Sequence, residues 1–379
     1  MAASRRPLRN LRRRLTTGAT RATRKLAPIA PRAAIDVLEQ VLGRIGPRLP
    51  VLAHMVETNM RAAGVYDRAA FTEYFRQVAL HLANAARIFR SRGREAAVGE
   101  IARREIVPDD SIEHARHAAE QGRGAIIVPA HACNFLISLA RLGQDLPICI
   151  FLRWSKDQHR LDMKRQWCEA AGLDVIVEPA NATDPTSRAA ACIDAVRQGK
   201  LLVITPDIAQ RSTDGVPVQW LGRTAYLPAG PAALAMLAEV PMIPLFARLG
   251  DGNTGGTPVP QSDQFDRGRA PGCGTGFQPV RTSSNRPIHV PTFEQPIMVD
   301  RLSRAEGGRK EAIRRAMQSW ADGFGRFIRD CPPAWLLWGD SRWTRVFRGD
   351  PKYAGRAKDK TAKKIAPPRS EAVARGETA

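Results

Sequence analysis

Two features that define common protein classes are missing from this sequence. The six cysteines are scattered and form no C-x-x-C pair, so neither a zinc site nor a disulfide framework is predicted. Long apolar runs are also absent. The stretch 124–140 carries no formal charge, but it contains Pro129, His131 and Asn134, whereas a membrane-spanning helix needs about 20 mostly apolar residues. We therefore predict no metal site and no transmembrane helix, and scattered cysteines are typical of a reducing compartment.

Acidic residues are absent before Asp36, where ten lysines and arginines occur, and nine basic residues face four acids from Arg348 onward. Much of the net charge of +21 therefore lies in two tails, predicted as a disordered basic arm (1–26) and a disordered basic tail (348–379). Basic tails favour an anionic partner: nucleic acid, anionic lipid or an acidic carrier protein. No apolar core follows the arginines before Pro28, which argues against a secretory signal; an organelle transit peptide is the lower-ranked alternative.

Between the tails, short apolar runs alternate with helical patterns. Strand-like runs occupy residues 125–128, 148–152, 174–177, 201–205, 242–249, 288–290 and 295–299, with a hairpin arm or edge strand at 216–221. Helical spacing occupies 158–171, 187–198, 230–238 and 309–328. This alternation predicts an α/β fold over residues 122–347, with an open, mostly parallel sheet and helices on both faces. Residues 250–287 are rich in glycine and proline and predict a flexible insertion.

An N-terminal helical segment is predicted to precede the sheet, over residues 27–121. Helical spacing of apolar residues is seen at 33–56, 68–92 and 110–121. The first of these helices is amphipathic, which leaves two interpretations open. It lies on a membrane surface with arginine on its polar face, or it packs on the body of the protein.

His131 is the candidate general base because it directly follows the strand at 125–128. Functional groups of α/β proteins gather where a strand's carboxyl end meets a helix, and histidine exchanges protons near neutral pH. The alternative is that His131 caps the following helix. Cys133 is a weaker candidate nucleophile, since side chains two residues apart on a turn rarely converge. Asn134 is predicted to cap the helix that follows.

Asp207 and Arg153 end the fourth and second predicted strands, so they face the same edge of the sheet as His131. Together these groups could bind an anionic or hydroxylated substrate; a structural ion pair between Arg153 and Asp207 is the alternative. Trp335 and Trp338 are either anchors at a lipid interface or aromatics that cover the sheet. The basic tails lack interleaved aromatics and a nucleic-acid module, so no specific nucleic acid is expected, although a basic nucleic-acid-binding protein stays an alternative.

Several blocks occur in an order that resembles one family over most of residues 55–347. They are Asn59-Met-Arg61, Gly124 to Leu136, Phe151-Leu-Arg153, Pro206-Asp207, Asp214 to Gly222, Pro228 to Ala232 and Pro333 to Trp338. The chain resembles the bacterial lipid A biosynthesis acyltransferases of the lauroyl/myristoyl type, within the glycerolipid acyltransferase superfamily.

The resemblance implies transfer of a fatty acyl group from an acyl-carrier-protein or CoA thioester to a hydroxyl of a lipid A precursor or related glycolipid. His131 and Asp207 are the implied catalytic residues, and Asn134, Arg153 and Gly230 the implied substrate-binding residues. No cofactor or metal is implied. The implied partners are the acyl donor, an anionic lipid or glycolipid acceptor and a membrane surface, with the protein peripheral on the cytoplasmic face of the inner membrane.

The sequence departs from the family pattern in the block around His131. The family has His, four residues, then Asp or Glu, and here that acid is replaced by Leu136. Cys133 stands where glycine is expected, and Ile208 where glutamine is expected. Three interpretations follow: Asp207 or another acid substitutes, the enzyme is slow or altered in acceptor, or the chain is a non-catalytic lipid-binding relative. We favour retained acyltransferase activity because His131 and the pocket blocks are present.

Overall fold

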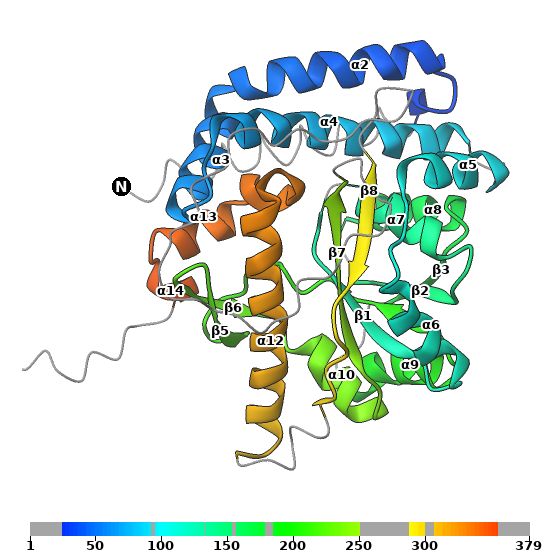
Figure 1. Cartoon of the computed structure of the whole chain (residues 1–379), viewed down its shortest axis with the longest axis vertical. Coiled ribbons are helices and arrows are strands. Elements are labelled where there is room, and N and C mark those ends of the chain that lie inside the picture. Colours follow the sequence, from blue (N-terminus) through cyan, green and yellow to red (C-terminus); the bar gives the residue numbers. More distant parts are fainter. Residues whose placement is uncertain are drawn as a thin grey trace, which may run out of the picture.

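A computed structural model describes residues 25–91, 95–132, 134–153, 157–178, 185–250, 288–299 and 307–354. Cys133, nearly all of the predicted arm and insertion, and the tail beyond Ala354 lie outside the described residues. Within them, six strands form one sheet in the order β3-β2-β4-β1-β7-β8 (Figure 1). Their bounds are β1 Ala125–Pro129, β2 Ile148–Leu152, β3 Asp174–Val177, β4 Leu201–Val203, β7 Met242–Leu249 and β8 His289–Phe293. All neighbours pair in parallel except β7 and β8.

Strand β1 explains why the sheet has helices on both faces. All five of its residues are buried, as expected for a central strand of a parallel sheet. Ile126 and Val128 pack into one core cluster, whereas Ala125 and Ile127 pack into another. Helices that contribute to the first cluster include α9 (Pro185–Arg197), α10 (Gly230–Ala238) and α12 (Gly308–Asp330). Those of the second are α5 (Glu95–Glu105), α6 (Ile112–Glu120), α7 (Phe135–Leu142) and α8 (Gln158–Ala170). The predicted α/β class and the N-terminal helical segment are confirmed.

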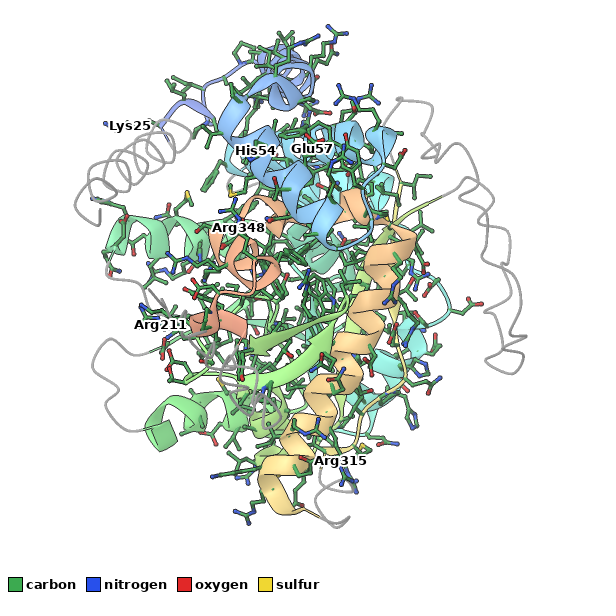
Figure 2. All side chains as sticks on the ribbon, turned by 90° about the vertical axis from the view of Figure 1, so that its left-hand side faces the viewer. Lys25, His54, Glu57, Arg211, Arg315 and Arg348 are labelled. Carbon is green, nitrogen blue, oxygen red and sulfur yellow. The ribbon has the colours of Figure 1, made fainter. Side chains whose placement is uncertain are left out.

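The N-terminal segment contains α2 (Arg32–Ile45), the 3₁₀ helix η1 (Gly46–Arg48), α3 (Pro50–Ala62) and α4 (Arg68–Arg90). The single helix predicted at 33–56 is wrong, because the chain turns at Gly46-Pro47. A Cβ at Gly46 would lie 2.5 Å from a ring carbon of Phe75, and Pro47 lacks the N–H that a continuous helix would use. Helix α4 lies between α2 and the sheet (Figure 1). In the side view, His54 and Glu57 mark these helices at one end of the molecule, with Arg315 of α12 near the other (Figure 2).

An aromatic core forms where α12 meets the end of the described chain. Trp320, Trp335 and Trp338 are each 0% exposed, so the lipid-anchor interpretation of Trp335 and Trp338 is wrong and the core interpretation is confirmed. The elements that hold them after α12 are η2 (Pro332–Ala334), η3 (Leu336–Gly339), α13 (Ser341–Phe347) and α14 (Pro351–Ala354). Helix α14 lies beyond the predicted boundary at Phe347, and its Tyr353 is buried in this core.

Other differences from the predicted elements are local. Helix α5 was not predicted, and the arm at 216–221 is one half of a two-stranded hairpin of β5 (Val216–Trp220) and β6 (Arg223–Leu227). The strand predicted at 295–299 is reduced to a single bridge between Met242 and Ile297. Charged and polar residues in α5, and a Leu-Gly turn at 221–222 that carries no polar side chain, give weak sequence signals, which is why sequence patterns miss such short elements.

Candidate active site

The register of β1 and β4 brings His131 and Asp207 together. These strands are parallel neighbours, with Ile127 opposite Val203. His131 follows Ile127 by four residues, and Asp207 follows Val203 by four, so both reach the same level beyond the carboxyl edge. The His131 Nδ1 and Asp207 Oδ1 atoms lie 2.6 Å apart. The structure therefore joins the two residues named from strand ends.

Asp207 is fully buried, and its carboxylate is held by hydrogen bonds. Its Oδ2 accepts from the backbone N–H of His131 and from the indole N–H of Trp335, each at 2.8 Å. The indole of Trp343 donates to the Asp207 backbone carbonyl at 2.9 Å. A buried carboxylate is stable only with such partners. Because an ionised carboxylate can only accept, it takes the Nδ1–H of His131 and leaves Nε2 as the imidazole's basic nitrogen.

The other side of the His131 ring faces partly open space. The side chain is 23% exposed, and Nε2 lies 3.5 Å from the Thr205 hydroxyl, at the limit of a hydrogen bond. The ring of Phe135 packs edge-on at a centroid distance of 5.5 Å. Nε2 can therefore take a proton from a ligand that enters beside Phe135 and Thr205.

The backbone around His131 is held by the C-terminal tryptophan segment. Ala132 forms an antiparallel bridge with Trp335, and the N–H of Leu336 donates to the His131 carbonyl at 2.9 Å. Sequence reasoning had no signal that this segment supports both residues of the pair, because the segment lies more than a hundred residues from either.

The family model for bacterial lipid A biosynthesis acyltransferases matches residues 71–257. This range runs from α4 past β7 and includes both His131 and Asp207. This part of the chain belongs to the bacterial lipid A biosynthesis acyltransferase family. Membership supports a lipid acyltransferase role. A comparison with curated proteins gives no match.

Leu136 stands where the resemblance to the lipid A acyltransferases places an acid. Its side chain is 3% exposed and belongs to the core cluster on the α7 face of the sheet. An ionised group there would be surrounded by apolar side chains. In this chain a carboxylate from the end of β4 occupies the position next to the imidazole, so the histidine has its partner without an acid at position 136.

Asn134 occupies the first position before α7, but the predicted side-chain cap is wrong. Its backbone is left-handed (φ 57°), and its side chain makes no capping hydrogen bond; asparagine tolerates this conformation better than most residues. The carboxamide instead accepts from Asn84 of α4 at 3.1 Å and lies 2.9 Å from His289 Nε2. It therefore fastens the loop after His131 to α4 and β8, and a substrate-binding role for Asn134 stays a prediction.

Arg153 and Gly230 are the other two residues predicted to bind substrate. The Arg153 side chain is 79% exposed, and its Nε lies 4.0 Å from Glu178, so the alternative of an ion pair with Asp207 is wrong. Gly230 begins α10 in an exposed position, where an added Cβ would meet open space. Neither is hydrogen-bonded to His131 or Asp207 among the described residues, and their substrate roles stay predictions.

His81 of α4 is a neighbour of the site that sequence reasoning missed. Its ring stacks on Phe135 at 5.9 Å, and the same Phe135 contacts His131. The pKa of His81 is lowered to about 4, mainly by burial and to a smaller extent by the positive charge that His131 can carry. His81 is therefore neutral near pH 7 and extends the aromatic wall beside His131. In the sequence His81 is one of several polar residues on an amphipathic helix, which gives no functional signal.

Proposed function

We propose that this protein transfers a fatty acyl group from an acyl-carrier-protein or CoA thioester to a hydroxyl of a lipid A precursor or a related glycolipid. The observation that carries the proposal is the hydrogen-bonded pair of His131 and the buried Asp207 at the carboxyl edge of β1 and β4. A strand-end histidine with an oriented basic nitrogen suits acyl transfer to a hydroxyl, which requires one proton to be removed and one returned.

In this proposal, His131 Nε2 removes the hydroxyl proton while the oxygen attacks the thioester carbonyl. The tetrahedral intermediate carries an oxyanion, for which backbone N–H groups near Asn134 at the start of α7 are the proposed donors. Collapse breaks the carbon–sulfur bond, and the imidazolium returns its proton to the thiolate. The products are the ester and the free thiol, with His131 restored. Asp207 stabilises the imidazolium in between, and the scheme needs no covalent enzyme intermediate.

We also propose a peripheral location on the cytoplasmic face of the inner membrane. No helix in the described part of the chain is long and apolar enough to span a bilayer. Helix α2 turns its acids inward, since Asp36 and Glu39 both pair with Arg87 of α4. Its outer face bears apolar residues that are between 40% and 59% exposed: Val37, Leu38, Val41 and Ile45. An exposed apolar face of this kind supports binding to a membrane surface.

The proposal is tested with the purified full chain, an acyl-carrier-protein or CoA thioester, and either a lipid A precursor or a lysophospholipid. We expect ester formation that His131→Ala abolishes and that His159→Ala, an exposed histidine on α8, leaves unchanged. Thermal unfolding of both variants checks that the fold is intact. If no acceptor is acylated in a His131-dependent way, the chain is a non-catalytic lipid-binding relative of the family.

A further inference from the structure

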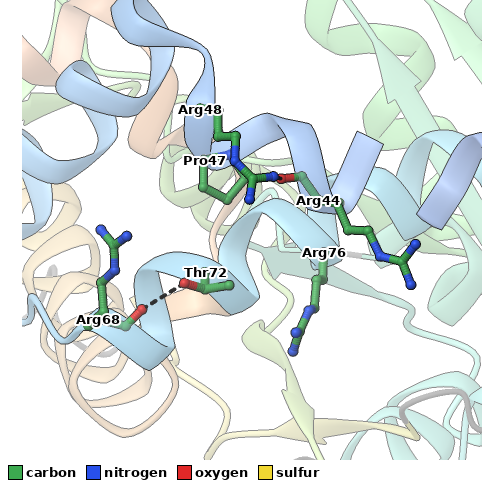
Figure 3. Close-up of a pocket in the computed structure, with 7 residues that line it drawn as sticks. Arg44, Pro47, Arg48, Arg68, Thr72 and Arg76 are labelled. Carbon is green, nitrogen blue, oxygen red and sulfur yellow. Dashed lines mark hydrogen bonds between the residues drawn. The ribbon is translucent and has the colours of Figure 1, made fainter. Parts of the chain in front are cut away.

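A second candidate site lies on the N-terminal helices, apart from His131. A pocket of about 320 Å³ is bordered by α2, η1 and α4. Four arginines line it: Arg44 of α2, Arg48 of η1, and Arg68 and Arg76 of α4. Figure 3 shows these side chains on the two helical layers, with Thr72 between the two arginines of α4.

The charge in this pocket is only partly compensated. Arg44 and Arg48 form no ion pair with a carboxylate among the described residues, whereas the charge of Arg68 acts on Glu57 of α3 and Arg76 lies 3.3 Å from Glu73. Asp67, the N-cap of α4, accepts from the backbone N–H groups of Ala69 and Ala70. Like charges gathered in one concavity repel each other, and an anion would offset that repulsion. Guanidinium groups match the oxygens of phosphate in particular, since their planar N–H forks donate two parallel hydrogen bonds.

The surroundings of the pocket indicate the source of the phosphate. Arg44 is followed directly by Ile45, which is 46% exposed, and the first turn of α3 carries Val51, which is 82% exposed. Arginines beside exposed apolar side chains are the pattern of a helix that lies in the interface of an anionic bilayer. We propose that the pocket is a phosphate-binding subsite, which holds the headgroup of an anionic membrane lipid while the apolar residues of α2 and α3 enter the acyl region.

The position of the pocket along α4 relates it to the candidate active site. Arg76 and Arg68 precede His81 by five and thirteen residues, which at 1.5 Å per residue is roughly 8 and 20 Å along the helix axis. His81 stacks on Phe135, and the same ring contacts His131. A headgroup in the pocket would thus set the reacting histidine at a defined distance from the bilayer. The inference rests on the proposed acylation of a lipid, and it adds the subsite that orients the protein.

The test compares full-length protein on vesicles of phosphatidylcholine alone and with phosphatidylglycerol added, by co-sedimentation. The key variant combines Arg44→Gln, Arg48→Gln and Arg68→Gln. Its matched control combines Arg211→Gln, Arg223→Gln and Arg329→Gln, which removes the same charge from exposed positions elsewhere. Loss of three basic contacts at an anionic surface should weaken binding by about 100-fold, whereas the control should weaken it by less than about tenfold, which is less than half of that effect in free energy.

Three results would overturn the subsite: an equal loss in both triple variants, no loss in either, or equal binding to neutral and anionic vesicles. Inorganic phosphate at constant ionic strength separates the two sources of phosphate. We expect it to compete weakly with vesicles, and full displacement at low concentration would indicate a site for free phosphate. Removing three repelling charges should not lower the thermal midpoint, so misfolding would be recognised.

Vesicle binding is measured without turnover, so its outcome is independent of catalysis. Inactive wild-type protein that still needs Arg44, Arg48 and Arg68 for vesicle binding would refute the acyltransferase proposal and keep the subsite. His131-dependent transfer together with vesicle binding that ignores these arginines would refute the subsite alone.

Discussion

Asp207→Asn is the sharpest test of the site because it changes one charge with almost no change of shape. Asp207 Oδ2 accepts from two donors, the His131 N–H and the Trp335 indole. An asparagine amide must place its oxygen toward these two donors, since the opposite orientation would set its NH₂ against both. The NH₂ then faces His131 Nδ1. Nδ1 must become an acceptor, which moves the imidazole proton to Nε2 and removes the basic lone pair.

The size of the effect follows from this change of tautomer. In the serine protease triad, the same substitution of the orienting aspartate costs about 10⁴-fold in rate, which corresponds to about 5.5 kcal/mol of barrier. The structural cost is smaller. All three hydrogen bonds keep a partner but lose the carboxylate charge, so we expect the free energy of unfolding to fall by about 1–3 kcal/mol.

Initial rates of acyl transfer for wild type, Asp207→Asn, His131→Ala and the double variant give the complete measurement. If the two residues act as a unit, the double variant is no slower than His131→Ala alone. Urea unfolding of the same proteins separates loss of chemistry from loss of fold. An Asp207→Asn rate within about tenfold of wild type, or a double variant whose loss is the product of the single losses, would refute the assigned pairing.

Three further variants test the surroundings of the pair. Leu136→Glu, which restores the family's acid, should lower the free energy of unfolding by more than Leu136→Met does. A buried unpaired charge is destabilising by about 3 kcal/mol or more, whereas a Leu-to-Met exchange is destabilising by less than about 1.5 kcal/mol. Equal urea midpoints of the two variants would contradict the buried placement of Leu136. Trp335→Phe removes one donor to Asp207 and should cost about 1–3 kcal/mol, with a smaller rate loss than Asp207→Asn; unchanged rate and midpoint would contradict that hydrogen bond. The pKa of His289 is lowered to about 3, mainly by burial and to a smaller extent by the charge that His81 can carry, so the unfolded chain takes up the proton first as the pH falls below about 6.5. As the pH is lowered from about 6.5 to 3, the free energy of unfolding should therefore fall by on the order of 1 kcal/mol per pH unit. In urea titrations at several pH values, His289→Gln should flatten this dependence. Equal pH dependence in wild type and variant would contradict a buried neutral His289.

The central strands were predictable because a parallel strand buried on both faces reads as a continuous apolar run. Strands β2, β3 and β7 begin and end where the sequence predicts them. The carboxyl ends of these parallel strands form one edge of the sheet. A histidine and an aspartate that follow two of the strands are therefore candidates for one site at that edge. Helix ends are harder to predict where a short break divides two helices, as at Gly46-Pro47, because the helical spacing of apolar residues continues across the turn.

Side-chain roles were less predictable than element positions. Asn134 has the residue type and place of a helix cap, yet its carboxamide bonds to Asn84 and His289, which lie 50 and 155 residues away. Sequence spacing cannot rank such distant partners against the local cap, since the choice depends on how α4 and β8 pack against the loop.

The sequence by itself determined the order of strands and helices, the edge at which His131 lies and the departure at Leu136, because these depend on local apolar patterns and residue identity. Tertiary structure decided which acid serves the histidine. His131 and Asp207 are 76 residues apart, and they meet only because β1 and β4 are neighbours in a register that carries both loops to the same level. Tertiary structure also decided that the terminal tryptophans support this pair and do not contact a lipid surface. It decided as well that the apolar face of α2 points outward, because the ion pairs of α2 with α4 form only when the two helices pack.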